Sequence, residues 1–287
     1  MNAMGDLKWL IFIIIGLGVA WFLVTGGNPD TGGPFLNPPA PISTGESYGG
    51  LPEGTISPTT PPISTSSLKD LVSISNYSSA KQTDPDKEYI KIKVSRNAKE
   101  KISISNWRLE SATTGAGDTL GKGAYLPYSG RVNTEQDIFL SAGDEVIVTT
   151  GRSPVGVSFK INKCTGYFSQ FQDFVPTLRK QCPEPIDDLP NFGPGTTFDQ
   201  CYDFVERLRK CKVYLQSPPG GVGGACQEYI TTKINYNTCV DKHKDDSDFP
   251  KGEWRVYLGR DQELWKRKRE VIKLLDQNGD VIDSVTY

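Results

Sequence analysis

The stretch VIKLLDQNGDVIDSV, residues 271–285, has two runs of alternating apolar residues on either side of Asn278-Gly279. Asn-Gly between two such runs is a strong signal for a β-hairpin, because both residues tolerate the left-handed backbone of a tight turn. We therefore expect two antiparallel strands, at 271–275 and 281–285.

The same two-residue alternation recurs along the chain and is typical of half-buried strands. Turn-rich clusters separate the runs. Many short strands separated by such turns predict a mainly β fold, an all-β sandwich. The further expected strands are KDLVSI (69–74), YIKIKV (89–94), KISI (101–104), DIFL (137–140), EVIVT (145–149) and WRVYL (254–258).

The segment 161–249 departs from this pattern and is predicted to be a partly helical insert between two parts of the β domain. Within it, TFDQCYDFVERLRKC (197–211) has helical spacing, with Cys201, Phe204, Leu208 and Cys211 on one face. Thr197 and Gln200 have the spacing of a capping box. A helix over 197–211 follows from this pattern.

All six cysteines lie in this insert, and no two of them form a C-x-x-C pair. The spacing therefore argues against a zinc site and for three disulfides, which need an oxidising compartment. Two cysteines ten residues apart on one helix are about 15 Å apart, too far for a bridge. Cys201 and Cys211 are therefore expected to pair with other cysteines, and the remaining pairings stay open. The predicted disulfide residues are Cys164, Cys182, Cys201, Cys211, Cys226 and Cys239.

The amino-terminal run WLIFIIIGLGVAWFLV (9–24) carries no charge and is long enough to cross a bilayer as a helix. We interpret residues 1–27 as a transmembrane signal-anchor, with a cleaved signal peptide as the alternative. Because the cysteines need an oxidising compartment, the amino terminus is expected in the cytoplasm and the rest of the chain outside the cell. Residues 28–67 are rich in Pro, Gly, Ser and Thr and are predicted to be a semi-extended, disordered linker.

The β-domain segments resemble lamin-tail domains. The resemblance rests on the closing hairpin at 263–287, on YIKI (89–92), on ISNWRL (104–109) and on AYLP (124–127). It covers 68–160 and 250–287 and does not include the cysteine-rich insert. It implies an immunoglobulin-like sandwich that serves as a binding or adaptor module without catalysis of its own. The chain as a whole is similar to membrane-anchored, lamin-tail-like proteins of bacteria.

Composition narrows the candidate chemistry. A net charge of −2 argues against bulk electrostatic binding of nucleic acid, and a single histidine leaves little room for His-based metal or Ser-His sites. His243 lies among acidic residues and is interpreted as part of a solvated loop rather than a metal ligand. The glycines at 115–123 lack the spacing of a nucleotide-binding loop. We therefore predict no catalytic residue, metal or cofactor.

Residues 250–275 hold the one basic concentration that stands out in the sequence. An anionic polymer such as DNA or a wall glycan could dock there beside a tryptophan. The alternative is a solvated edge strand whose charges discourage pairing with another sheet. The candidate residues for polymer binding are Arg255, Arg260, Trp265, Lys266, Arg267, Lys268, Arg269 and Lys273.

Together these features predict a non-enzymatic, membrane-anchored extracellular binding or scaffolding module of the cell envelope. Its expected partners are the membrane and an extracellular protein or envelope polymer, with nucleic acid less favoured. The alternatives are an envelope hydrolase with catalytic groups in the insert, and a protein that binds extracellular DNA or another anionic polymer.

Overall fold

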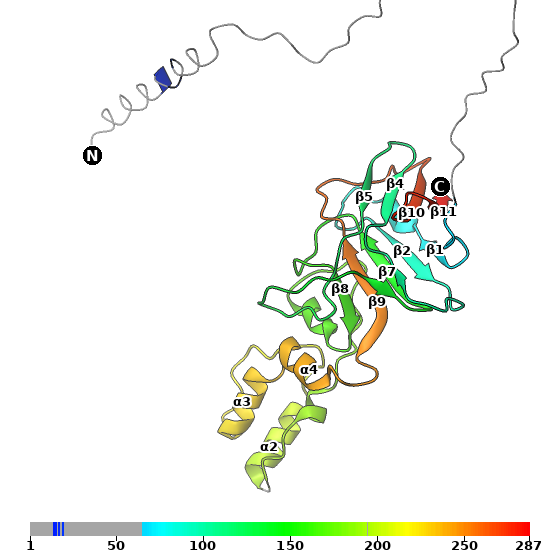
Figure 1. Cartoon of the computed structure of the whole chain (residues 1–287). Helices are drawn as coiled ribbons and strands as arrows, with labels where there is room; N and C mark the ends of the chain where they lie inside the picture. The colour runs from blue at the N-terminus through cyan, green and yellow to red at the C-terminus, as the bar shows by residue number, and fades with distance from the viewer. Residues whose placement is uncertain (1–13, 16, 18, 20–64, 194) are drawn as a thin grey trace, which may run out of the picture. The chain divides into compact units, whose positions relative to one another are not determined.

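The computed structural model describes residues 65–193 and 195–287, together with residues 14, 15, 17 and 19, which are helical (Figure 1). Apart from those four residues, the predicted membrane anchor lies outside the described residues, and so does nearly all of the predicted linker. Among the residues that are described, no helix is both long and apolar enough to span a membrane.

Two sheets form the body of the domain. The larger has the strand order β1-β2-β7-β9-β8 and the smaller the order β11-β10-β4-β5, while β3 and β6 pair separately. All pairs are antiparallel except β7 with β9. The strands are β1 (Val72–Asn76), β2 (Tyr89–Val94), β3 (Ile102–Ser103), β4 (Arg108–Ser111), β5 (Gly117–Thr119), β6 (Phe139–Leu140), β7 (Glu145–Thr149), β8 (Phe159–Asn162), β9 (Pro250–Tyr257), β10 (Val271–Leu275) and β11 (Val281–Thr286).

One apolar core lies between the two sheets. Ile90 and Ile92 of β2 share it with Leu109 of β4 and with Ile272 and Leu274 of β10, and all five are fully buried. Alternate residues of each strand supply this core, as the two-residue period requires. The chain is thus mainly β with sandwich-like packing, as the sequence predicted.

The expected strands at 89–94 and 145–149 are confirmed, and so is the closing hairpin. Asp276 shapes the turn of that hairpin, because its Oδ1 accepts hydrogen bonds from the backbone N–H groups of Asn278 (2.8 Å) and Asp280 (3.1 Å). Gly279 has a φ of 86°, which few other residues adopt without strain. Strand β1 begins at Val72 rather than at 69, because residues 68–71 form a turn.

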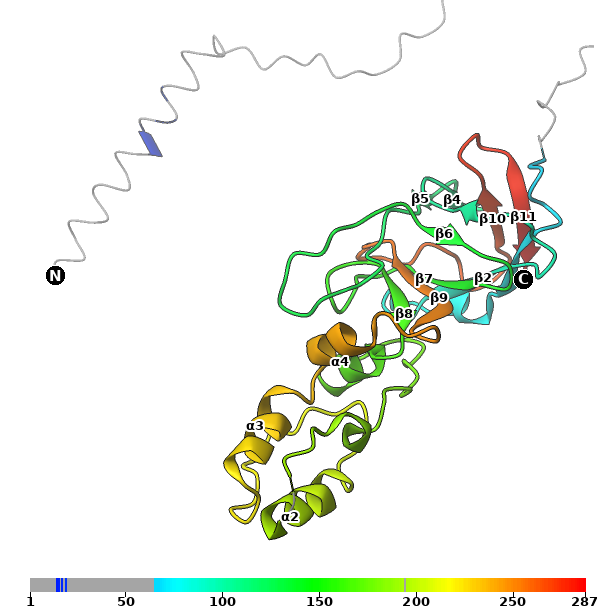
Figure 2. The ribbon, with the colours of Figure 1, turned by 60° about the horizontal axis from the view of Figure 1, so that its bottom comes forward.

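The insert leaves the sheet after β8 and returns at β9, where Asn162 lies opposite Pro250. The expected boundary at 161 therefore falls inside β8. The insert holds two short 3-10 helices, η2 (Thr165–Gln170) and η3 (Pro185–Asp188), and three α-helices: α2 (Thr196–Val205), α3 (Gly224–Thr232) and α4 (Tyr236–His243). Helix α4 lies next to β8 and β9, and α2 and α3 lie farther from the sheets (Figures 1 and 2).

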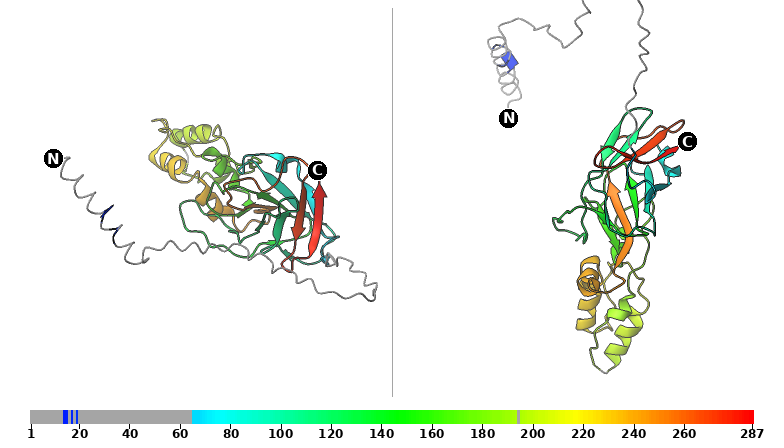
Figure 3. Two further views of the ribbon diagram at one scale, coloured as in Figure 1. Left: turned by 90° about the horizontal axis from the view of Figure 1, so that it is seen from above. Right: turned by 45° about the vertical axis from the view of Figure 1, so that its right-hand side comes forward.

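A second apolar core fills the insert. It is built from the six cysteines and from aromatic and aliphatic side chains, and Phe159 of β8 extends into it. Phe159 meets Phe168 and Phe174 edge-on, at centroid distances of 5.9 and 6.1 Å. This contact joins the insert to the sandwich, and the two belong to one compact unit. The insert lies at one end of the sandwich, opposite the end where the described chain begins beside β11 (Figure 3).

The helix expected over 197–211 is shorter than predicted. It ends at Val205, and the backbone N–H groups of Arg207 and Leu208 turn to carbonyls three residues back. Cys211 has a φ of 56°, in the left-handed region, so the chain turns away to meet Cys182. The expected cap at Thr197 is also wrong, because the N-cap residue is Gly195 and no side chain caps the helix.

Candidate functional site in the disulfide-linked insert

Three disulfides close the insert, as predicted. Cys164 pairs with Cys239, Cys182 with Cys211, and Cys201 with Cys226. The first ties α4 to the residues after β8, and the third links α2 to α3. Cys201 and Cys211 do not pair with each other, in line with the distance argument. The cysteines therefore attach the insert to the sheet and hold its helices together.

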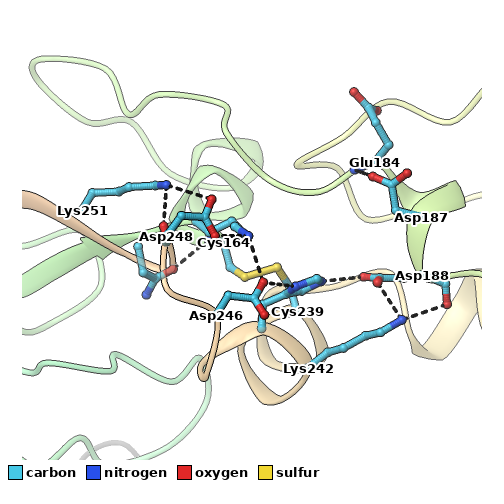
Figure 4. A network of polar contacts seen from close by, with 12 residues as sticks. Cys164, Glu184, Asp187, Asp188, Cys239, Lys242, Asp246, Asp248 and Lys251 are labelled. Atoms are coloured by element: carbon cyan, nitrogen blue, oxygen red, sulfur yellow. Dashed lines mark hydrogen bonds and ion pairs between the residues drawn. A yellow bond between two sulfur atoms is a disulfide. The ribbon is translucent and has the colours of Figure 1, made fainter.

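An ion-pair network surrounds the Cys164–Cys239 disulfide (Figure 4). His243 is the last residue of α4 and lies between two carboxylates, with Nε2 at 3.0 Å from Asp188 and Nδ1 at 2.8 Å from Asp246. Asp188 also pairs with Lys242 at 2.6 Å, and Asp246 with Lys163 at 2.9 Å. The expectation of a solvated loop at His243 is wrong, since the side chain is only 15% exposed.

The network alternates in charge and connects η3, α4 and the residues after β8. Burial alone lowers the pKa of His243, but its contacts with Asp188 and Asp246 outweigh that effect and raise the pKa above the usual value of 6.5. Lys163, in turn, lowers the pKa of Asp246. No group of side chains suited to hold a metal ion occurs among the described residues.

A basic cleft opens on the surface of the insert. It has a volume of about 400 Å³ and is formed by Gln170 of η2 with residues 207–209 and 212–216. Gln170 binds the backbone of Val213, because its amide N–H donates to the carbonyl of Val213 (3.0 Å) and its amide oxygen accepts from the N–H of Val213 (2.6 Å). Tyr214 packs edge-on against Phe204 at 5.4 Å. The wall of this basic cleft is thus tied to both η2 and α2.

Three cations line the basic cleft: Arg207, Arg209 and Lys212. All three are exposed, none forms an ion pair with another described residue, and no acidic residue lines the cleft. Their neighbour Lys210 is instead paired with Glu184 at 3.0 Å. Clustered like charges repel one another, so the cleft favours an anion that neutralises them. Arginine is especially suited to phosphate, sulfate and carboxylate groups, which it can bind through two parallel hydrogen bonds.

The predicted polymer-binding segment is only partly available. Arg255 is 3% exposed and is bound to Glu253 and to the carbonyl of Pro176. Trp265 is 1% exposed and belongs to the sandwich core. Arg260 pairs with Asp118 at 3.3 Å. Burial and pairing therefore remove these three residues from the predicted surface.

What remains exposed is the basic loop, residues 266–269, which carries Lys266, Arg267, Lys268 and Arg269. It is a loop rather than the edge strand considered above. Lys273 is half-buried on β10, which lies between β4 and β11. Glu270 anchors the loop, because its carboxylate accepts from the N–H groups of Lys266 (2.9 Å) and Val271 (2.8 Å). Glu270, which follows the basic loop, is therefore bound to the first residue of the loop and closes it.

Sequence reasoning missed the basic cleft. The run RLRKCK (207–212) carries four basic residues around Cys211, and that was the available signal. Its spacing predicts only the end of an amphipathic helix. Gln170, which also lines the cleft, lies 37 or more residues upstream in the chain, so no local pattern indicates a cleft.

No protein-family model matches this chain, and no curated protein matches it in sequence.

Proposed function

We propose that this protein is a non-enzymatic binding module of the cell envelope and that the basic cleft of the insert is its contact surface for an anionic envelope polymer. The observation that carries the proposal is the set of three cations around one concave surface, Arg207, Arg209 and Lys212, with which no described residue forms an ion pair. A repeating polyanion can meet several of them at once, so that weak individual contacts add.

The folded domain is proposed to lie outside the cell. Three disulfides favour an extracellular position, because such bonds persist in oxidising compartments. The apolar segment at 9–24 would then serve as the membrane anchor, with the amino terminus in the cytoplasm. The sandwich would act as a lamin-tail-like, immunoglobulin-like scaffold that carries the insert. The basic cleft would face away from the end of the sandwich where the linker enters.

Glu88 is a carboxyl group that a hydrolase could not use as its catalytic acid. A hydrolase that uses paired carboxyl groups needs an acid whose pKa is raised and which the substrate can reach. Burial raises the pKa of the Glu88 carboxyl group. Glu88 is fully buried in the sandwich and bound to backbone amides. A substrate in solvent has no access to it.

The test compares two triple charge reversals in the full-length protein in detergent. One variant carries Arg207→Glu, Arg209→Glu and Lys212→Glu; the matched control carries Lys266→Glu, Arg267→Glu and Lys268→Glu, with the same change in net charge. Binding to immobilised dextran sulfate is measured in a salt series, with neutral dextran as a blank. We expect the insert variant to lose about 10-fold or more in affinity and the control to change about 2-fold or less.

The salt dependence separates a local contact from a general charge effect. Each lost phosphate-type contact lowers the slope of log affinity against log salt by about one, so the slope should flatten by about three in the insert variant. Loss of binding in the loop variant alone would move the site to the basic loop. Equal losses in both variants would contradict a dedicated cleft. Tighter binding of duplex DNA than of dextran sulfate would favour a nucleic-acid ligand.

A further inference from the structure

A second cleft lies on the sandwich, separate from the basic cleft of the insert. It has a volume of about 410 Å³ and forms where β8 and β9 meet the loops before β6 and β7. Lys160 of β8 lies in it opposite Trp254 of β9, which is its partner in the strand pair. Tyr125 and Phe139 also line the cleft, and they are 40% and 50% exposed. We call this surface the Lys160 cleft.

The ammonium group of Lys160 has unusual surroundings for a lysine. The side chain is only 12% exposed, and its Nζ lies 5.6 Å from the ring centroid of Tyr125 and 5.5 Å from that of Trp254. The nearest carboxylate among the described residues is that of Asp144, at 3.8 Å. At that distance it is a charge neighbour without a good hydrogen bond. Among the described residues, Lys160 Nζ thus forms no hydrogen bond of 3.5 Å or less, and its one charge partner is the more distant carboxylate of Asp144.

Burial is the largest influence on this group and lowers the pKa of Lys160, against the opposing effect of Asp144. A buried ammonium that lacks a close partner destabilises a fold. A methionine of similar length would fill the same space without that penalty. The lysine is therefore explained better by something that it binds than by packing.

Two of the other charges that line the Lys160 cleft are paired with residues outside it, and the lining carboxylate of Asp144 faces Lys160 itself. Lys251 contacts Asp248, and Asp137 contacts Lys122 at 3.7 Å. Lys101 also lines the cleft and adds positive charge near Lys160. The excess charge of the cleft is therefore positive, and the exposed rings of Tyr125 and Phe139 line the same cleft.

We propose that the Lys160 cleft binds a single acidic sugar residue, with the sugar ring against Tyr125 and Phe139 and its carboxylate on the ammonium group of Lys160. The carboxylate supplies the missing acceptor in a charge-assisted hydrogen bond. The aromatic faces attract the C–H groups of a pyranose ring. Gln136 and Ser141, which also line the cleft, offer partners for ring hydroxyls.

The ligand class is tested with four small probes that separate charge from ring. Galacturonate has both features, galactose has only the ring, acetate has only the carboxylate, and N-acetylalanine imitates a peptide carboxyl terminus. Binding to the full-length protein in detergent is followed by NMR line broadening of each probe. We expect galacturonate to bind about 10-fold or more tightly than galactose or acetate. Equal binding of either single-feature probe would overturn the acidic-sugar assignment, and tighter binding of N-acetylalanine would replace it with a peptide terminus.

Substitutions of cleft residues test whether galacturonate binds in the Lys160 cleft. Lys160→Met and Tyr125→Ala should each weaken galacturonate binding, the first by about 10-fold or more. The matched control is Lys122→Met, a neighbouring exposed lysine, which should change affinity about 2-fold or less. Retained binding in Lys160→Met would overturn the proposal.

Two further measurements test whether Lys160 serves binding rather than stability, and whether galacturonate binds independently of the basic cleft. Lys160→Met should not lower the thermal unfolding midpoint, because it removes a poorly partnered buried charge. A lowered midpoint would show that the lysine is kept for stability and would contradict the proposal. The Arg207→Glu, Arg209→Glu, Lys212→Glu variant should still bind galacturonate, so the two sites can fail independently; its loss of galacturonate would overturn the placement at Lys160.

Discussion

The carboxylate of Glu88 accepts a hydrogen bond of 2.7 Å from the backbone N–H of Leu264, although the two residues lie 176 positions apart. It also accepts from the N–H of Trp265 at 3.3 Å. Glu88 precedes β2 and is fully buried. This contact draws the segment before the basic loop into the sandwich and places the indole of Trp265 in the core.

We expect Glu88→Ala to lower the free energy of unfolding by about 2–4 kcal/mol, because two buried N–H groups lose their acceptor. Glu88→Gln should cost less, since its amide oxygen still accepts. Burial raises the pKa of Glu88, so the folded protein holds this proton more tightly than the unfolded chain. Its contribution to stability therefore declines as pH rises from about 4.5 through the folded pKa, and the Gln variant should lack that decline. Urea unfolding at several pH values measures both effects; equal losses in the Ala and Gln variants would contradict the acceptor role.

The only histidine in the chain makes the charge network directly observable, because one imidazole signal reports on it. An NMR titration should give a pKa for His243 above 6.5, and Asp188→Asn should lower that pKa. Asp245→Asn, at an exposed neighbouring position, serves as the control and should leave it nearly unchanged. A pKa at or below 6.5 in the parent protein would be incompatible with the contacts described.

The same network predicts a pH dependence of stability. Because the folded pKa of His243 is raised, its contribution is fully present below pH 6.5 and is lost as pH rises through the folded pKa. His243→Gln should therefore remove a fall in the unfolding midpoint just above pH 6.5. Thermal melts of the two proteins across pH 5–9 check this expectation, and parallel curves would count against it.

The three disulfides should differ in their contributions. Cys164–Cys239 spans 75 residues, whereas Cys182–Cys211 and Cys201–Cys226 span 29 and 25. In the chain-entropy account the longest loop contributes about 4.5 kcal/mol and the shorter ones about 3.5 kcal/mol each. Replacing both cysteines of each pair by alanine, followed by urea unfolding, should make the Cys164/Cys239 variant the least stable. Peptide mapping without reductant checks the pairing itself, and any other connectivity would contradict the structure.

The hairpin turn allows a matched glycine comparison. Gly279 has a φ of 86°, whereas Gly121 lies outside the left-handed region, and a Cβ added to Gly121 would have no neighbouring atom within 4 Å. Gly279→Ala should therefore destabilise the protein by about 1–2 kcal/mol, while Gly121→Ala should stay within about 0.5 kcal/mol of the parent. Chemical denaturation measures both. Similar effects at the two positions would show that backbone strain is not the cause.

The predicted and observed environments differ most clearly at Trp265, which is buried in the sandwich core rather than exposed. The four basic residues that follow it predict a surface contact for a polymer. Instead, its backbone N–H is bound by the buried carboxylate of Glu88, 177 positions away in the chain. Arg255 shows the same problem, because its partner carbonyl belongs to Pro176 in the insert. No local pattern around either residue predicts these contacts.

Alternation along 89–94, 145–149 and 271–285 was enough to predict strands and a hairpin, because the side chains of a strand alternate between two faces whatever they later meet. The number and spacing of the cysteines were likewise enough to predict three disulfides. Only the tertiary structure decided which cysteines pair, where α2 ends, and which basic residues stay exposed. These outcomes depend on contacts between residues tens to hundreds of positions apart, and such contacts exist only once the sheets and the insert have packed. The basic cleft and the Lys160 cleft are both products of that packing.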